Sequence, residues 1–331
     1  MRDFTATPKT ELHLHLEGAA PPAFIRQLAH EKKVDLGGIF GGDGNYEWHG
    51  FVNFLAVYEA ACSVLQTPDD FARLTEAVLA ESAKHGVIYT EIFLAPDFCG
   101  GDLVKWREYL AAMCEAAARQ EAKLGITSRF ISTVVRHFGA DNARKTARMS
   151  ADTASHMLTG FGMGGDENFG DAGDFAWAFA CAAEAGLGLT SHAGEVRGAE
   201  SVVQTLRDLK VSRIGHGVRA VEDADLMKRL AGEGVHLEVN PGSNISLSVF
   251  PALADHSINK LRDAGISISI STDDPPYFDT DMSREYAGLN ATFGWGEADF
   301  RAINRDAMAA AFCDEATRAR IAARFEESAN D

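Results

Sequence analysis

One pattern recurs along this chain and constrains its fold more than any other feature. Stretches with helical periodicity end at a glycine, and a short run of apolar and β-branched residues follows at once. A glycine just past a helix can adopt the left-handed conformation that ends it, and the runs are too short and too apolar for surface helices. The pattern occurs at five glycines: Gly86, Gly125, Gly186, Gly234 and Gly265. It predicts buried parallel strands that alternate with helices.

Eight strands can be placed in this way. They are expected at residues 11–16, 87–94, 126–135, 157–163, 187–191, 212–217, 235–239 and 266–271. Residues 174–185 and 222–232 have helical periodicity. T-P-D-D at residues 67–70 marks the start of another helix, because it combines an N-cap threonine, a proline in the first turn and two acids near the positive end of the helix dipole. Eight strands that alternate with helices predict an α/β fold, the (β/α)8 TIM barrel.

The chain is longer than such a barrel requires. A TIM barrel typically needs about 250 residues, and the chain has 331. The surplus lies between the first two strands, where Phe51, Phe54, Leu55 and Tyr58 recur at helical spacing. Such a stripe can pack on the core or cover the mouth of the barrel, and both can hold. We expect one barrel domain over residues 1–331, with a helical insertion at about 17–86 that covers the face where barrels of this kind bind their ligands.

Composition limits the partners and the compartment. The chain has 31 Lys and Arg against 48 Asp and Glu, a formal net charge of −17. Such acidity repels nucleic-acid phosphates and anionic lipid, and no apolar run approaches the roughly 18 residues that span a bilayer. The five cysteines are scattered without a C-x-x-C pair, which is typical of reduced thiols. We expect a cytoplasmic enzyme with a small-molecule partner, no nucleic acid and no membrane; monomer and homo-oligomer both stay open.

Histidines at the expected strand ends indicate a metal site. His13 and His15 alternate with leucines on the first strand, so both imidazoles point the same way. His192, His216 and Asp273 each follow or end a later strand. Because barrel active sites are built from the C-terminal strand ends, these side chains are expected to converge. Three of these four histidines, together with the aspartate, would form a donor set that suits zinc.

Two other features have weaker support. G-x-G-x-x-G occurs at residues 160–165, but its first glycines lie inside an expected strand, and Asp166 and Glu167 would repel a pyrophosphate. A nicotinamide cofactor is therefore not expected. His137 lies at a strand end and is kept as a reserve metal ligand.

Four motifs, in this order, resemble the adenosine deaminase family. They are H-L-H-L-E-G at residues 13–18, H-A-G-E at 192–195, G-H-G at 215–217 and T-D-D-P at 272–275. This family comprises zinc-dependent amidohydrolase barrels and includes adenine deaminases as well. The resemblance extends from Pro8 to about Arg324 and implies one Zn²⁺ per chain. Its ligands would be His13, His15, His192 and Asp273.

The resemblance also implies roles for other residues. The catalytic residues would be Glu195, His216 and Asp273. The substrate contacts would be Glu17, Gly165 and Asp274. Glu195 would protonate the purine at N1 while C6 is attacked, and His216 would orient the attacking hydroxide. For that role Glu195 must start protonated, which an apolar enclosure favours. Since no lysine occurs in 151–190 to bridge a second metal, a single metal is expected.

The expected activity is zinc-dependent hydrolytic deamination of adenosine and 2′-deoxyadenosine to inosine plus ammonia, in purine salvage. The enzyme would be a hydrolase acting on C–N bonds of cyclic amidines. G-D-E at residues 165–167 resembles adenosine deaminases, whereas Glu17, Tyr58 and residues 64–67 look like adenine deaminases. Adenine, or another 6-aminopurine derivative, is therefore the alternative substrate. A metal-dependent phosphoesterase barrel and a non-catalytic barrel are the alternatives from other classes.

Overall fold

A computed structural model describes residues 2–327 as a barrel of eight parallel strands whose spatial order follows the chain. The strands are β1 Lys9–His15, β2 Val87–Leu94, β3 Thr127–Val135, β4 Leu158–Gly164, β5 Gly188–Ala193, β6 Arg213–His216, β7 His236–Val239 and β8 Ile268–Ile270. The residues after β8 close the barrel on β1, because the His15 N–H donates to the Asp273 carbonyl (3.0 Å) and the Asp273 N–H donates to the His13 carbonyl (3.1 Å). The predicted (β/α)8 TIM barrel is confirmed.

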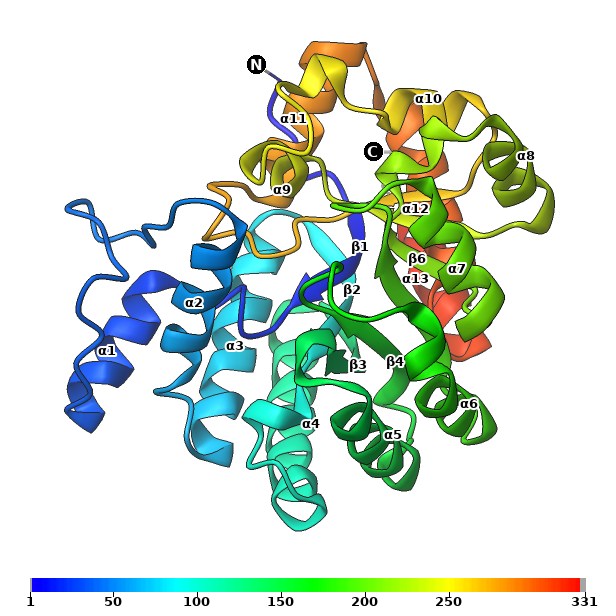
Figure 1. Cartoon of the computed structure of the whole chain (residues 1–331). Coiled ribbons are helices and arrows are strands. Elements are labelled where there is room, and N and C mark those ends of the chain that lie inside the picture. Colours follow the sequence, from blue (N-terminus) through cyan, green and yellow to red (C-terminus); the bar gives the residue numbers. More distant parts are fainter. Residues whose placement is uncertain (1, 328–331) are drawn as a thin grey trace.

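Helices surround the strands (Figure 1). The helices before β5 are α1 Pro22–Lys32, α2 Phe51–Cys62, α3 Pro68–Lys84, α4 Leu103–Leu124, α5 Ala140–Thr153 and α6 Ala176–Glu184. Those that follow are α7 Ala199–Leu209, α8 Ala224–Glu233, α9 Pro241–Ser246, α10 Ile258–Asp263, α11 Met282–Phe293, α12 Glu297–Ala310 and α13 Glu315–Glu327. Over residues 2–327, none of these helices has both the length and the apolar character needed to cross a membrane.

Local sequence signals explain where the elements begin and end. All five helix-ending glycines have a positive φ, between 68° and 81°, as a left-handed helix end requires. Thr67 caps α3: its side chain accepts from the Asp70 N–H (3.2 Å), and the Asp70 carboxylate accepts from the Thr67 N–H (2.8 Å). The expected strand bounds agree with the structure to within two residues.

The segment between β1 and β2 forms α1, α2 and α3 on one side of the barrel (Figure 1). One face of α2 lines a cavity at the C-terminal end of the barrel, and histidines from the strand ends line this cavity as well. Phe54 on this face is also buried, and its ring packs 5.4 Å from Tyr277 and 5.3 Å from Phe278, in the loop after β8. The apolar stripe of α2 therefore serves both as core and as cavity wall. The single-domain assignment stays a prediction, and its ends, residues 1 and 328–331, lie outside the described residues.

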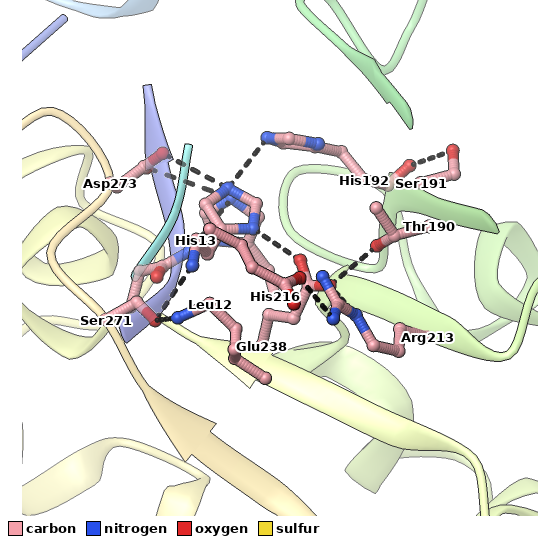
Figure 2. A network of polar contacts seen from close by, with 12 residues as sticks. Leu12, His13, Thr190, Ser191, His192, Arg213, His216, Glu238, Ser271 and Asp273 are labelled. Atoms are coloured by element: carbon pink, nitrogen blue, oxygen red, sulfur yellow. Dashed lines mark hydrogen bonds and ion pairs between the residues drawn. The ribbon is translucent and has the colours of Figure 1, made fainter. Parts of the chain in front are cut away.

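A charge network fills the barrel interior below the histidines. Arg213 donates through Nε to Glu238 Oε1 and through Nη1 to Glu91 Oε2, both at 2.6 Å, and all three side chains are at most 1% exposed. The guanidinium lies 3.7 Å from the centroid of the Phe312 ring. Glu238 in turn contacts His13 (Figure 2). Through Glu238, the buried Arg213 is thereby connected to the histidines at the C-terminal end of the barrel.

Replacing Arg213 by methionine should destabilise the fold. Two buried carboxylates would lose their counter-ion, which typically costs about 3–5 kcal/mol of the free energy of unfolding. Urea unfolding of metal-free protein measures the loss. Arg207→Met is the matched control, because Arg207 pairs with Asp208 on the exposed side of α7 and should leave the midpoint unchanged. Equal midpoints for the two variants would contradict the role of the network.

Candidate active site

Four side chains from β1, β5 and the loop after β8 converge at the C-terminal end of the barrel. The Nε2 atom of His192 lies 3.0 Å from that of His13 and 3.2 Å from that of His15. Asp273 Oδ1 lies 3.3 Å from the Nε2 atoms of both His13 and His15. In a tetrahedral site with bonds of about 2.0–2.1 Å, ligand atoms lie about 3.3 Å from one another. The spacing therefore fits a single tetrahedral metal ion.

The outer nitrogens of these histidines support the same conclusion. His13 Nδ1 lies 2.7 Å from Glu238 Oε2, and His192 Nδ1 lies 2.8 Å from the Met163 carbonyl (Figure 2 shows the His13 contacts). Both partners only accept, so each Nδ1 carries the hydrogen and each Nε2 presents a lone pair to the centre. Lone pairs that face one another at 3.0 Å repel unless a metal ion or a proton lies between them. The protonation pattern of these side chains alone therefore fits a bound metal ion.

His216 lies beside this set. The second oxygen of Asp273, Oδ2, accepts from Ser243 Oγ (2.7 Å) and lies 3.8 Å from His216 Nε2. The ligand atoms of His216 still fall within 4.8 Å of those of His13, His192 and Asp273. His216 and Asp273 both have a left-handed backbone, with φ of 63° and 67°. Such strain outside glycine is uncommon and concentrates at functional sites.

Glu195 is held in the turn after β5 by a second glutamate. The buried Glu167 carboxylate accepts from four successive backbone N–H groups of that turn, at 2.6–3.2 Å. Glu195 itself is buried and lies 3.4 Å from His216 Nδ1. Burial, followed by the negative charges of Asp273 and Glu167, raises the pKa of Glu195 well above its ordinary value. A carboxyl group whose protonated form is favoured therefore lies beside the metal-binding set.

The three expected substrate contacts line the same cavity as Glu195. Burial raises the pKa of Glu17 to about 7; burial and then the charges of Asp273 and Glu195 raise the pKa of Asp274 well above its ordinary value. Among the described residues, Asp274 Oδ1 has no hydrogen-bond partner, so it is available to a ligand. A Cβ at Gly18 would lie 1.5 Å from that oxygen, which explains the glycine that ends H-L-H-L-E-G.

The remaining wall of the cavity is mostly apolar. It is formed by Phe51, Phe54, Leu55, Tyr58, Leu94, Phe98 and Val134. The backbone of Gly165 has a φ of 94°, and a Cβ there would lie 2.9 Å from His137 Nδ1. A flat aromatic ligand with polar edges matches a cavity that has apolar walls and a few convergent polar groups.

His137 is not part of the metal-binding set. Its Nδ1 accepts from the Asp166 N–H (3.4 Å), and its Nε2 lies 3.4 Å from Glu59 Oε1 on α2. It lines the mouth of the cavity, so the structure gives no support to its use as a reserve ligand.

The sequence did not reveal several residues whose side chains contact and hold the residues of the site. They are Glu167, Glu238, Asn240, Ser243 and Asn244. Only Glu238 had a visible signal, because it is a charged residue between Leu237 and Val239 in a strand expected to be buried. Glu167 and Asn240 lie in loops, and Ser243 and Asn244 lie on the short helix α9. In such segments the sequence pattern does not show which side chains face inward.

Comparison with known proteins identifies close relatives. The chain is 46% identical over 317 residues to a Rhizobium johnstonii protein named adenine deaminase, an alignment that covers 96% of this chain and 98% of that one. An adenine deaminase of Agrobacterium fabrum is 45% identical over 322 residues, with coverage of 97% and 98%. The crystal structure of an adenine deaminase from Arthrobacter aurescens superposes with a TM-score of 0.90 at 29% identity, over 98% of this chain and 99% of that one.

These relatives correct one prediction. Adenosine and 2′-deoxyadenosine as the main substrates are contradicted, because all three relatives are named adenine deaminases. The error arose from G-D-E at residues 165–167. In the structure the Glu167 carboxylate binds backbone N–H groups of the next turn, and Asp166 accepts from the Asn168 N–H (2.9 Å). Of these three residues, only Gly165 lines the cavity. The G-D-E element therefore reflects the structure of the loop and does not indicate a contact with a sugar.

A family model described as adenosine deaminase matches residues 8–328, nearly the whole chain. Deaminases of this superfamily are metal-dependent, and the His and Asp cluster fits a metal site. The match excludes the phosphoesterase alternative and the non-catalytic barrel. The chain therefore belongs to the adenosine deaminase family of amidohydrolases, hydrolases that act on C–N bonds of cyclic amidines.

Proposed function

We propose that this protein binds one Zn²⁺ per chain and hydrolyses adenine to hypoxanthine and ammonia. The observation that carries the proposal is the position of Glu195. A carboxyl group with a strongly raised pKa lies beside a tetrahedral N₃O donor set, within one cavity of mostly apolar wall. The near-full-length relatives named adenine deaminase support the choice of substrate.

The ligands are His13, His15, His192 and Asp273, and zinc suits three imidazole nitrogens with one carboxylate oxygen. When bound, zinc lowers the pKa of a coordinated water to about 7 and so supplies a nucleophile at neutral pH. The protein supplies the remaining chemistry. Glu195 gives its proton to N1 as oxygen adds to C6, which prevents negative charge from accumulating on the ring. The Glu195 carboxylate then takes the proton of the hydroxyl added at C6 and passes it to the 6-amino group. The C6–N bond breaks, ammonia leaves, and C6 becomes a carbonyl.

Three residues orient the purine. The Gly165 N–H donates to N3, and Asp274, with an unpartnered carboxyl oxygen, bonds at N7. Glu17 accepts from the Ala95 N–H (3.2 Å) and is hydrogen-bonded to Tyr58 on α2. These bonds fix the Glu17 carboxyl in the wall of the cavity, which favours a base over a nucleoside that needs room for its sugar.

Removal of one ligand tests the metal assignment. Asp273→Ala should lose zinc and deaminase activity together, because the variant leaves three imidazole lone pairs without the anionic ligand. Metal content by mass spectrometry should fall from about one zinc per chain towards zero after dialysis. Retention of tight stoichiometric zinc by the variant, or two metals in the wild type at full occupancy, would overturn the assignment.

A second variant separates metal binding from proton transfer. Glu195→Gln should keep zinc but lower kcat for adenine by on the order of a hundredfold or more, since the amide has no acidic proton to give. Glu233→Gln, at an exposed ion pair with Arg229 on α8, is the matched control and should keep wild-type kcat. Wild-type turnover by Glu195→Gln would remove Glu195 from the mechanism.

The substrate is tested by a panel of aminopurines. Zinc-replete enzyme should deaminate adenine with a kcat/KM on the order of a hundredfold above that for adenosine or 2′-deoxyadenosine. The change in purine absorbance on deamination gives the rates directly. Faster turnover of either nucleoside than of adenine would show that the proposed substrate is incorrect.

A further inference from the structure

Behind His216 lies a chain of hydrogen bonds that leads away from the metal-binding set. It begins at His256, just before α10, and passes through Asn244 on α9 to His216 and Glu195. All four side chains are buried. Because buried imidazoles and amides have fixed donors and acceptors, the direction of each bond can be worked out from one end.

His256 sets the direction. The backbone N–H of Ile258 donates to His256 Nδ1 (3.0 Å), and a backbone N–H can only donate. Burial lowers the pKa of His256 to about 3, so the ring is neutral and carries its one hydrogen on Nε2. That Nε2–H donates to Asn244 Oδ1 at 3.1 Å. The carboxamide of Asn244 is thereby fixed with its oxygen towards His256.

The NH₂ group of Asn244 then faces the catalytic side chains. Asn244 Nδ2 lies 3.2 Å from His216 Nδ1 and 3.4 Å from Glu195 Oε1. An amide nitrogen only donates, so His216 Nδ1 must accept. Asn240 Nδ2 lies 3.3 Å from His216 Nδ1 and 3.5 Å from His216 Nε2, so this contact does not distinguish between the two ring nitrogens. The Asn244 contact therefore disfavours a hydrogen on His216 Nδ1.

The competing arrangement has His216 Nδ1–H donating to Glu195 Oε1, 3.4 Å away. In that form the hydrogen would lie against the NH₂ group of Asn244, and this buried donor would lose its acceptor on His216. The observed contacts instead leave the hydrogen on His216 Nε2, on the side that faces Asp273 Oδ2 (3.8 Å). The arrangement thus presents an N–H donor towards the metal-binding set.

We infer that Asn244, fixed by His256, is a positioning residue that holds His216 in its Nε2–H tautomer and Glu195 Oε1 as an acceptor. His216 then acts as a hydrogen-bond donor to the attacking oxygen, and the proton of Glu195 lies on Oε2, free to reach the purine. The kinetic part of this inference rests on the proposed function, whereas the tautomer itself does not.

The tautomer can be measured directly in the zinc-loaded enzyme. Ring ¹⁵N spectra of histidine-labelled protein, with His216 assigned by loss of its signals in His216→Gln, should show a protonated Nε2 and an unprotonated Nδ1 at pH 7. A protonated Nδ1, or an imidazolium, would overturn the inference whatever the substrate proves to be. Absence of adenine turnover with the expected spectrum would instead count against the proposed function alone.

Paired variants separate positioning from a merely structural role. His256→Gln places an amide donor near the position of the imidazole Nε2 and should keep the His216 tautomer and kcat. His256→Phe removes the donor, so Asn244 loses its fixed orientation, and kcat should fall by about tenfold or more with zinc content retained and KM little changed. Equal losses in both variants with an unchanged His216 spectrum would contradict the inference.

Asn244→Asp tests the central link. Its carboxylate can accept from both His256 and His216, so it should move the His216 hydrogen to Nδ1 and lower kcat while zinc is kept. An unchanged tautomer and unchanged kcat in this variant would overturn the inference. If Asn244→Asp does not fold, the two His256 variants still decide the question.

Discussion

Four contacts of 3.0–3.3 Å join three imidazole nitrogens and a carboxylate oxygen in the mouth of the barrel, and a metal ion between these atoms makes that arrangement favourable. The closest approach is the 3.0 Å between the Nε2 atoms of His13 and His192. Much of the surrounding structure serves this constraint. Glu238 and the Met163 carbonyl fix which nitrogen carries the hydrogen, and Ser243 holds the second oxygen of Asp273. Arg213 balances Glu238 from the barrel interior.

The carboxyl groups of the site divide into two kinds. Burial opposes ionisation of Glu238, but Arg213 and His13 outweigh it and lower its pKa to about 2. Burial and neighbouring negative charge instead raise the pKa values of Glu195 and Asp274. Pairs of acids pushed in opposite directions are how a single site provides both fixed anions and proton donors at neutral pH. Here the fixed anions face the metal-binding set, and the proton donors line the cavity.

The regular architecture could be predicted from the sequence because its signals are local. Gly86 and Gly234 end helices, and the apolar runs after them are too short to be anything but buried strands. The histidines and Asp273 were placed together because barrel strands end on a common face. His13 and Glu238 are far apart in sequence, and the partners of Asn244 depend on loop conformation. Such contacts are set by tertiary packing. The substrate was misjudged because G-D-E at residues 165–167 resembles adenosine deaminases. In the fold the Glu167 carboxylate of this element binds backbone N–H groups.

The position of the metal tests this account most directly. Crystals of the zinc-loaded protein should give a single anomalous peak at the zinc edge, about 2.0–2.2 Å from the Nε2 atoms of His13, His15 and His192 and from Asp273 Oδ1. His216 Nε2 should lie outside the bonding distance, with an oxygen ligand between it and the metal. A peak bonded to His216 in place of His15, or a second metal of equal height, would contradict the arrangement derived from the structure.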